Sequence, residues 1–169
     1  MIEKYETMDN NNSLVQISQA VEIIKTAILQ SQERTIRNAN ADVLALNYAV
    51  GGFISQQSKL HQWGSGIIKS ISEKLQRDLP GLRGFGYENL KKMRQFYESW
   101  TPYIIGSPTA TQIALPKLQM SFASSAQEIE SAHDFLSISF SHHMEILNKT
   151  STLEERWFYI QHAAAYKWR

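Results

Sequence analysis

The sequence predicts an all-α fold, a helical bundle that contains a helix-turn-helix-like unit. Apolar residues recur at spacings of three and four along most of the chain, as in helices that bury one face. A stretch rich in proline and glycine separates two of these patterns, as a turn between paired helices requires. The 169 residues and the apolar content of 43% suffice for one domain with a core. We expect that domain at residues 13–169, after a flexible N-terminus at residues 1–12.

The first predicted helix begins at Ser13, which can cap a helix, and Gln16 completes a weak capping box. We favour packing inside the domain for the apolar stripe that follows, because two heptads are short for a coiled coil. A dimer seam stays open as the alternative. The stripe consists of Leu14, Ile17, Val21, Ile24 and Ile28.

A second helical pattern follows between residues 36 and 54. Asn47 lies on its apolar face and, if buried, must be hydrogen-bonded, which favours a role in helix register over a role in ligand binding. Gly51 and Gly52 each cost a helix interior about 1 kcal/mol relative to alanine. They indicate either a close crossing by another helix or a break.

Two helices at residues 65–79 and 86–100 form the centre of the prediction. Pro80 ends the first, because proline lacks an N–H and disfavours helix at the preceding residue. Glycines at positions 81, 84 and 86 permit backbone angles that other residues resist. Glu88–Lys92 and Arg94–Glu98 have the i,i+4 spacing of helical ion pairs. The outline is that of a helix-turn-helix unit with a longer turn than usual.

The pattern is lost at residues 101–127, where a small β-hairpin within 101–125 and a mobile linker are equal alternatives. A helix is expected over 126–148 and a last one over 153–168. The last helix follows a capping-box pattern, in which Ser151 and Thr152 precede two glutamates. The chain ends inside this pattern, so we expect a piece of a longer protein.

The charge distribution favours nucleic-acid binding in only one part of the chain. The net charge is +1, but residues 61–100 carry seven basic and four acidic side chains, an excess of three positive charges. Phosphate binding needs such charge, although a solvated face would explain it equally well. The absence of cysteine excludes disulfides, thiolate nucleophiles and cysteine-based zinc sites. We find no apolar run of about 20 residues and no signal peptide, and therefore expect a cytoplasmic protein without membrane partners.

The candidate DNA contacts lie on the paired helices. Arginine can bind guanine through two hydrogen bonds, whereas lysine mostly supplies charge. We expect some of these side chains to face duplex DNA, namely Tyr87, Lys91, Lys92, Arg94 and Gln95. We expect Lys69 and Arg83 to contact phosphates.

Two adjacent histidines, His142 and His143, are the obvious candidates for catalysis or metal binding, with His133 and Glu145 nearby. Glu130 and His133 have the Glu-x-x-His spacing of di-iron bundles, but those bundles need a second such motif. Glu145 could meet His142 across one helical turn. We favour a pair of structural histidines that hydrogen-bond across the core, and we expect no metal, no cofactor and no enzymatic activity in this chain.

An ordered series of motifs resembles the N-terminal domain of YhcG-like bacterial proteins over residues 14–168. The first half of the series contains Asn47, Gly51, Trp63-Gly64, Asp78-Leu79-Pro80-Gly81, Gly84-Phe85, Asn89-Leu90, Met93-Arg94 and Phe96-Tyr97. The second half contains residues 136–143, Glu155-Arg156, Phe158-Tyr159 and Trp168. Two positions depart from the family pattern: Gly86 replaces a serine, and Glu88 replaces a basic residue.

In that family the domain precedes a PD-(D/E)XK nuclease domain, and no Asp-x-Lys or Glu-x-Lys of such a nuclease occurs in this chain. The resemblance therefore implies a non-catalytic DNA-binding or targeting module of a nuclease-type protein. The alternative is a protein-interaction or dimerisation module, which would be a homo-oligomer or would dock on the C-terminal nuclease domain through Trp157 and Trp168.

Overall fold

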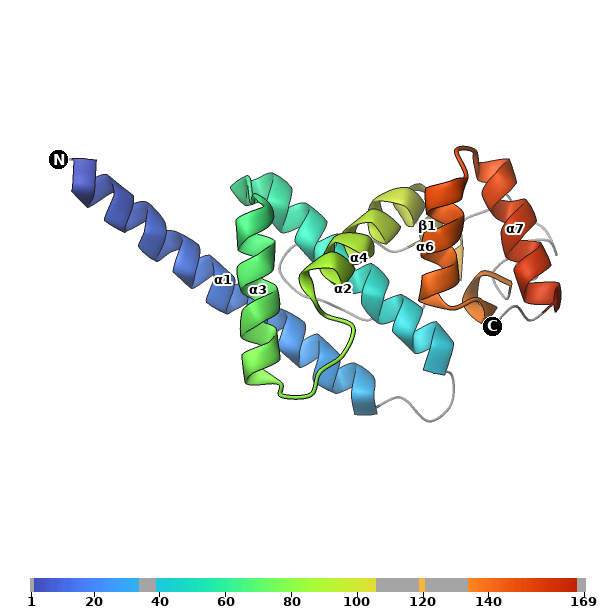
Figure 1. The fold of residues 1–169 in the computed structure, drawn as a ribbon, viewed down its shortest axis with the longest axis horizontal. Helices are drawn as coiled ribbons and strands as arrows, with labels where there is room; N and C mark the ends of the chain where they lie inside the picture. The colour runs from blue at the N-terminus through green and yellow to red at the C-terminus, as the bar shows by residue number, and fades with distance from the viewer. Residues whose placement is uncertain (1, 34–38, 106–118, 121–133, 167–169) are drawn as a thin grey trace.

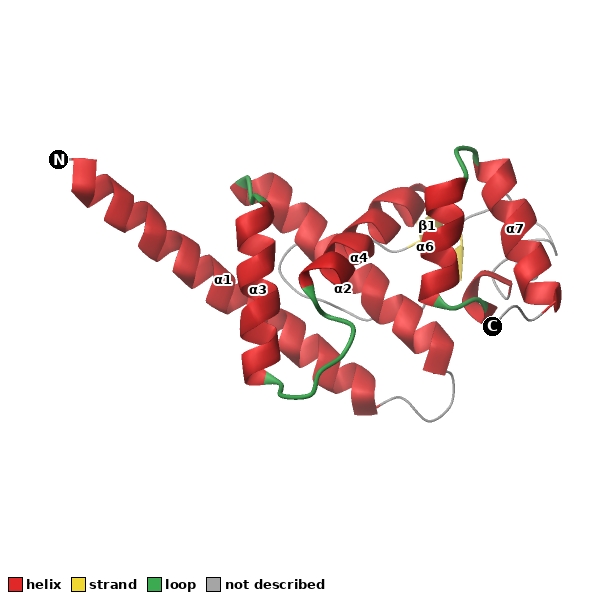
Figure 2. Ribbon diagram, viewed as in Figure 1, coloured by secondary structure: helices red, strands yellow, loops and turns green. Residues whose placement is uncertain are grey.

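A computed structural model describes residues 2–33, 39–105, 119–120 and 134–166 of the chain (Figure 1). Helices make up most of this part, which confirms the all-α prediction (Figure 2). In chain order they are α1 (Ile2–Glu33), α2 (Ala39–His61), α3 (Ser65–Asp78), α4 (Tyr87–Trp100), the 3-10 turn η1 (Thr101–Tyr103), α6 (Phe140–Lys149) and α7 (Leu153–Tyr166). None of these helices combines the length and the apolar composition that crossing a membrane requires.

A short antiparallel pair of strands accompanies the helices. It joins β1 (Ile104–Ile105) to β2 (Gln119–Met120), with Ile104 opposite Met120. Both strands fall inside the segment for which a hairpin was one of two alternatives. The residues between them lie outside the described part of the chain.

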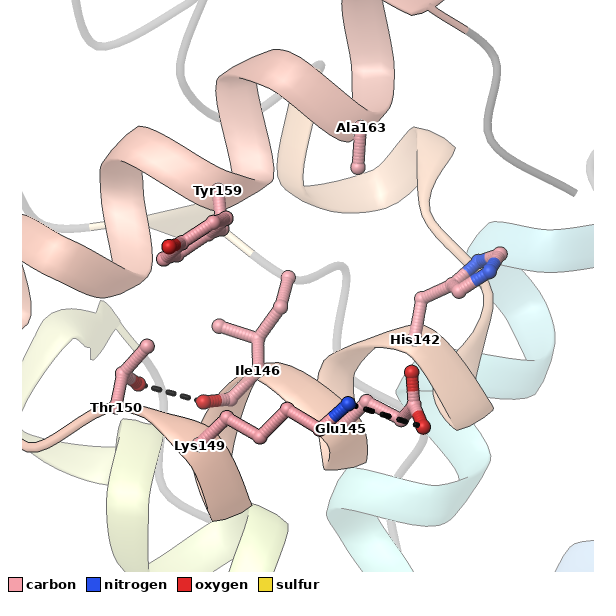
Figure 3. Close-up of a pocket in the computed structure, with 7 residues that line it drawn as sticks. All are labelled: His142, Glu145, Ile146, Lys149, Thr150, Tyr159 and Ala163. Carbon is pink, nitrogen blue, oxygen red and sulfur yellow. Dashed lines mark hydrogen bonds and ion pairs between the residues drawn. The ribbon is translucent and has the colours of Figure 1, made fainter.

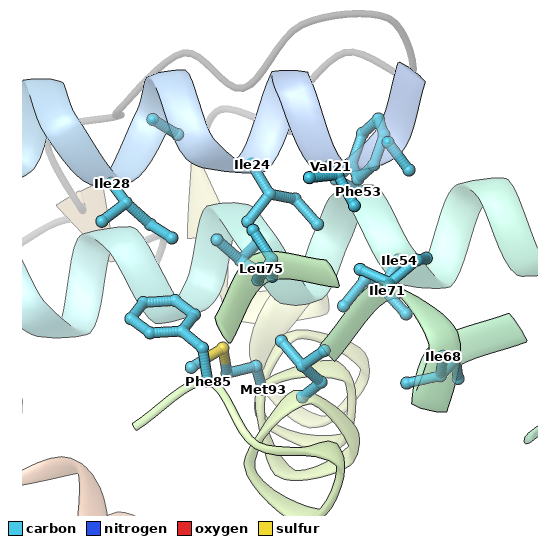
Figure 4. Close-up of a cluster of buried hydrophobic side chains, with 14 of the residues drawn as sticks. Val21, Ile24, Ile28, Phe53, Ile54, Ile68, Ile71, Leu75, Phe85 and Met93 are labelled. Atoms are coloured by element: carbon cyan, nitrogen blue, oxygen red, sulfur yellow. The ribbon is translucent and has the colours of Figure 1, made fainter. Parts of the chain in front are cut away.

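The apolar core has two parts, and α2 and α4 contribute to both. In the first part, side chains of α1, α2, α3 and the first half of α4 point toward one another (Figure 4). In the second part, the start of α2 and the end of α4 pack with α6 and α7. The helices α2 and α4 therefore connect the α1–α3 end of the molecule to the α6–α7 end (Figure 1).

The crossing of α2 and α4 depends on Gly51. A Cβ atom at this position would lie 1.9 Å from the backbone oxygen of Met93, a separation that no side chain can occupy. Of the two interpretations of the glycine pair, the close crossing is confirmed and the break is wrong, since α2 runs through both glycines. Asn47 is also buried in α2, with 6% of its surface exposed.

The first helix starts earlier than predicted. It begins at Ile2, so Ser13 lies inside α1 and the predicted cap there is wrong. The reason is that residues 2–12 contain neither proline nor glycine, and a possible cap does not stop a helix that can continue past it. The apolar stripe from Ile17 to Ile28 is buried against α2 and α3, which confirms packing inside the domain and excludes that stripe as a dimer seam. Leu14 is the exception, at 57% exposed.

The paired helices α3 and α4 have the predicted positions. Gly81 and Gly84 adopt positive φ angles of 82° and 86°, so the connection needs glycine at both places. Gly86 has an ordinary φ of −67° and serves as the N-cap of α4 without any side-chain cap. The family pattern has a serine at this position, which could cap the helix. With Gly86 there, the first N–H groups of α4 have neither an intrahelical acceptor nor a side-chain acceptor.

The helix predicted at 126–148 is confirmed over most of its described part, but it is interrupted at residues 138 and 139. Residues 134–137 form one helical turn, and α6 then starts after Ser139, whose hydroxyl accepts from the N–H of His142. Asn40 of α2 stabilises the break, since its Nδ2 donates to the carbonyl oxygens of Leu136 and Ile138 at 2.6 and 2.8 Å. Residues 126–133 lie outside the described part.

The last helix begins with the predicted capping box. The Glu155 N–H donates to Thr152 Oγ1 at 3.2 Å, and Glu155 Oε2 accepts from the N–H groups of Ser151 and Thr152 at 2.9 and 3.2 Å. These backbone hydrogen bonds hold the pKa of the Glu155 carboxyl below its usual value. The predicted last helix at 153–168 is described as far as Tyr166.

Replacing Thr152 with alanine should destabilise the protein by about 1 kcal/mol, because it removes the oxygen that accepts from the N–H of Glu155. Urea unfolding followed by circular dichroism measures this difference. Ser151→Ala is the matched control, because Ser151 contributes its backbone N–H to the box. Equal destabilisation by both substitutions would contradict the capping role.

Candidate nucleic-acid interface

The helix α4 buries one side and exposes the other. Its buried side packs into both parts of the core through Leu90, Met93, Phe96, Tyr97 and Trp100. On the opposite side, Lys91, Lys92 and Gln95 are exposed, while Tyr87 and Arg94 are partly exposed. The periodicity of the sequence predicted this division, and five of the seven candidate contacts share the exposed side.

An acidic neighbour restrains Lys91. Its Nζ lies 3.3 Å from Glu88 Oε1 and 4.6 Å from the centre of the Tyr87 ring. The hydrogen bond to Glu88 raises the pKa of Lys91 above its usual value, so the ammonium stays charged. The i,i+4 spacing predicted an ion pair between Glu88 and Lys92. In the structure Glu88 pairs instead with Lys91, at the i,i+3 spacing.

Arg94 is held more firmly than Lys91. Its Nε donates to Glu98 Oε1 at 2.9 Å, as the i,i+4 spacing predicted. The same oxygen accepts from the buried Ser55 hydroxyl of α2 at 2.7 Å. Burial alone would raise the pKa of Glu98, but the hydrogen bonds from Arg94 and Ser55 outweigh it and lower that pKa. Arg94 therefore helps to join α4 to α2 as well as lying on the outer side.

The remaining candidate side chains differ in whether they have a hydrogen-bond or ion-pair partner among the described residues. Gln95 Nε2 donates to Asn148 Oδ1 of α6 at 3.1 Å. By contrast, Lys69 of α3, Arg83 of the connection and Lys92 of α4 are exposed and have no ion-pair partner among the residues described here. These three cations can meet an incoming phosphate without first breaking an ion pair.

One edge of α3 borders the start of α4. Lys69 and Gln76 share that edge at 100° per residue. A Cβ atom at Gly86 would lie 3.9 Å from Gln76 Nε2, which places the edge next to the uncapped N-terminus of α4. The name α4 face is used below for the exposed side of α4 together with Lys69 and Arg83, which the DNA-binding hypothesis assigns to one surface. Whether it acts as a helix-turn-helix unit stays a prediction.

Sequence reasoning missed a pocket between α6 and α7, with a volume of about 240 Å³ (Figure 3). His142, Glu145 and Lys149 line it from α6, and Tyr159 and Ala163 from α7. The Glu145 and Lys149 side chains form an ion pair of 3.8 Å on its rim. Among the described residues, no three His, Asp or Glu side chains gather closely enough to hold a metal ion. Glu130 and His133, which have the Glu-x-x-His spacing, lie outside the described residues.

The two histidines have different environments. His143 is fully buried, and its Nε2 donates to the carbonyl oxygen of Phe135 at 2.8 Å, so the structural interpretation is confirmed for this residue. Burial lowers the pKa of His143 to about 4. His142 was expected to bond across the core as well, but it is only partly buried, and its Nδ1 lies 3.1 Å from Ser139 Oγ of its own helix cap. The two side chains differ because neighbouring positions of a helix point about 100° apart, so His142 does not share the buried side of α6 that carries His143.

Comparison with known proteins gives one family. A family model described as the DUF1016 N-terminal domain matches residues 23–169. No curated protein and no solved structure matches the chain.

Proposed function

From the premise that the chain belongs to the DUF1016 N-terminal domain family, we propose that it is a non-catalytic DNA-binding and targeting module of a PD-(D/E)XK nuclease-type protein. The family match confirms the resemblance to the N-terminal domain of YhcG-like proteins. The observation that carries the DNA-binding proposal is the α4 face. It combines exposed cations, a partly exposed tyrosine and a helix N-terminus without a side-chain cap.

Each part of the α4 face suits a phosphate backbone. Lysine and arginine release counterions from the nucleic acid when they neutralise phosphates. The uncapped N–H groups at the start of α4 attract anions, and the helix dipole adds to this attraction. Lys69, Arg83 and Lys92 can bind a phosphate directly. Lys91 and Arg94 must first break their ion pairs with Glu88 and Glu98. We therefore expect moderate affinity with strong salt dependence.

The first test is fluorescence anisotropy with labelled duplex and single-stranded DNA over a salt series. Lys91→Ala combined with Arg94→Ala should weaken binding to all sequences alike, and each lost phosphate contact should reduce the salt slope by about 0.9. Lys149→Ala is the matched control, since that lysine is 74% exposed on α6 and is not one of the seven candidate contacts. Unchanged affinity in the double variant, with unfolding behaviour preserved, would show that the α4 face does not bind DNA.

Replacing Glu88 with glutamine should strengthen DNA binding by about fivefold at low salt. The substitution removes a negative charge from the α4 face and releases Lys91, and one charge contact in water is worth about 1 kcal/mol. The gain should vanish at high salt, because exposed charges are then screened. Glu145→Gln removes a similarly exposed carboxylate from α6 and should have no effect. Equal gains from both substitutions would mean that only net charge matters.

The alternative function, a protein-interaction or dimerisation module that docks on a nuclease domain or another partner, has its own support. Three aromatic side chains of α7 are exposed, namely Phe158, Tyr159 and Tyr166. These residues lie on α7, whereas the candidate DNA contacts lie on α3, on α4 and on the connection between them (Figure 1). The two functions are therefore separable by mutation.

A further inference from the structure

Gln95 occupies the middle of the exposed side of α4. It follows Lys91 by four residues and Lys92 by three, so both lysines are its neighbours on the helix surface. All three side chains are exposed, while the opposite side of α4 is buried in the core. A DNA backbone that meets the two ammonium groups therefore brings the base edges of the duplex next to Gln95.

A second helix holds the Gln95 side chain in place. Its Nε2 donates to Oδ1 of Asn148 at 3.1 Å, across 53 residues of sequence. Asn148 lies near the end of α6, which packs against the second half of α4 (Figure 1). Both amides are exposed, so the bond lies at the surface, where a ligand can reach it. A glutamine that another side chain already orients loses less rotamer freedom on binding, which favours a defined contact.

The amide chemistry of Gln95 matches one base. A glutamine amide has two N–H donors and one carbonyl oxygen, and the bond to Asn148 uses one of the donors. The second N–H and Oε1 together form a donor–acceptor pair. In the major groove adenine presents its N6 amino group as a donor and N7 as an acceptor, whereas guanine presents two acceptors. The pair on Gln95 therefore complements adenine and not guanine.

We propose that Gln95, oriented by Asn148, reads adenine in the major groove of duplex DNA. This inference rests on the proposed DNA-binding function and adds a sequence preference to it. Oε1 of Gln95 accepts from the adenine N6 amino group, and Nε2 donates to N7. Gln95 is thus the specificity-determining residue, and Asn148 is a positioning residue that acts through it. Lys91 and Lys92 contact the phosphates beside this base and carry no sequence information.

The arginine of α4 is less suited to reading a base. Arg94 is only partly exposed, and its Nε donates to Glu98 Oε1 at 2.9 Å. The same oxygen accepts from Ser55 of α2. Moving the guanidinium to a guanine would break a bond that helps to join α4 to α2, whereas Gln95 can keep its bond to Asn148 while it contacts adenine.

Selection from a random-sequence duplex library by the whole chain tests the preference. The wild type should enrich sites with one fixed adenine, and replacing that base pair with G·C should weaken binding roughly fivefold to a hundredfold. Exchanging the adenine for 7-deazaadenine, which still pairs with thymine but lacks N7, should weaken binding about fivefold. Gln95→Ala should lose both effects and keep the salt-dependent affinity. Gln161→Ala is the matched control, since Gln161 is an exposed glutamine on α7.

Two substitutions test the positioning role of Asn148. Asn148→Ala removes the oxygen that accepts from Gln95 and should reduce the discrimination between adenine and 7-deazaadenine, with urea unfolding unchanged. Asn148→Asp keeps an acceptor oxygen and should retain the discrimination, although its negative charge lowers the affinity for all DNA. A merely structural role of Asn148 would change stability and leave the discrimination as it is.

The outcomes separate this proposal from the DNA-binding proposal. Salt-dependent binding by the wild type without a preferred base would overturn the role of Gln95 and leave DNA binding intact. The same holds for an adenine preference that survives Gln95→Ala. Absence of DNA binding by the wild type at low salt would overturn both proposals together.

Discussion

Replacing Gly51 with alanine should destabilise the protein by about 3 kcal/mol or more. The added methyl group would lie 1.9 Å from the Met93 oxygen and 2.4 Å from the Met93 carbonyl carbon. Both are backbone atoms, so no side-chain rotation relieves the overlap, and α2 and α4 must move apart. Because these helices join the two parts of the core, their separation loosens packing at both ends. The loss should appear as a lower urea midpoint and a lower melting temperature.

Gly66→Ala is the matched control for this prediction. Gly66 lies in α3, where a Cβ atom would meet nothing within 4 Å. Alanine should therefore stabilise α3 there, by at most about 1 kcal/mol, because it is the better helix former. The same chemical change is thus expected to have opposite signs at the two sites. If Gly51→Ala were as stable as the wild type, the close crossing of α2 and α4 would be wrong.

Local signals explain the elements that the sequence predicted well. Pro80 and the glycines beside it set the limits of α3 and α4, and Thr152 with Glu155 fixes the start of α7. Each of these signals acts within a few residues, so periodicity and capping rules detect it. Gly51 is intermediate, because the sequence offered a crossing or a break and only the position of Met93 in α4 decides between them.

Contacts between distant residues explain most of what the sequence did not predict. The break before α6 is stabilised by Asn40, which lies 96 residues before Leu136 in the chain and is invisible to a search for helical periodicity. At the candidate interface, the spacing predicted the Arg94–Glu98 pair, but the hydrogen bond from Ser55 comes from another helix. The exposed side of α7 was missed for a similar reason, since a pattern of apolar residues does not tell which side lacks a neighbour.

The stability of the protein should fall steeply between pH 6.5 and pH 4 because of His143. Burial keeps its native imidazole neutral down to a pKa of about 4, whereas the unfolded chain takes up the proton near the usual pKa of 6.5. The stabilisation is therefore complete above pH 6.5 and is lost as the pH falls toward 4. Each pH unit in this window costs about 1.4 kcal/mol, so the loss approaches about 3 kcal/mol at pH 4. Urea unfolding at a series of pH values measures the curve.

The packing around His143 explains why protonation is so unfavourable. Its ring lies among Phe96, Trp100 and Phe135, with the Phe135 ring centre 4.3 Å away. Nε2 already donates to the Phe135 carbonyl oxygen, and Nδ1 has no hydrogen-bond partner that could receive a second proton. The positively charged imidazole would thus be buried in an aromatic cluster with one N–H unsatisfied.

A comparison of variants isolates the contribution of His143 from that of the acidic groups. His143→Phe should lower stability at neutral pH, because it leaves the Phe135 carbonyl oxygen unsatisfied. It should also reduce the slope of unfolding free energy against pH between pH 6.5 and pH 4 by the equivalent of about one proton. His142→Gln, at a partly exposed position, should keep the slope of the wild type. Glu98 and Glu155 have lowered pKa values, so their stabilisation is lost mainly below pH 4.5 and does not produce a slope above it. A wild-type curve that is flat from pH 6.5 to pH 4.5 would mean that His143 is protonated in the folded protein, and that the aromatic cluster admits water or a second acceptor.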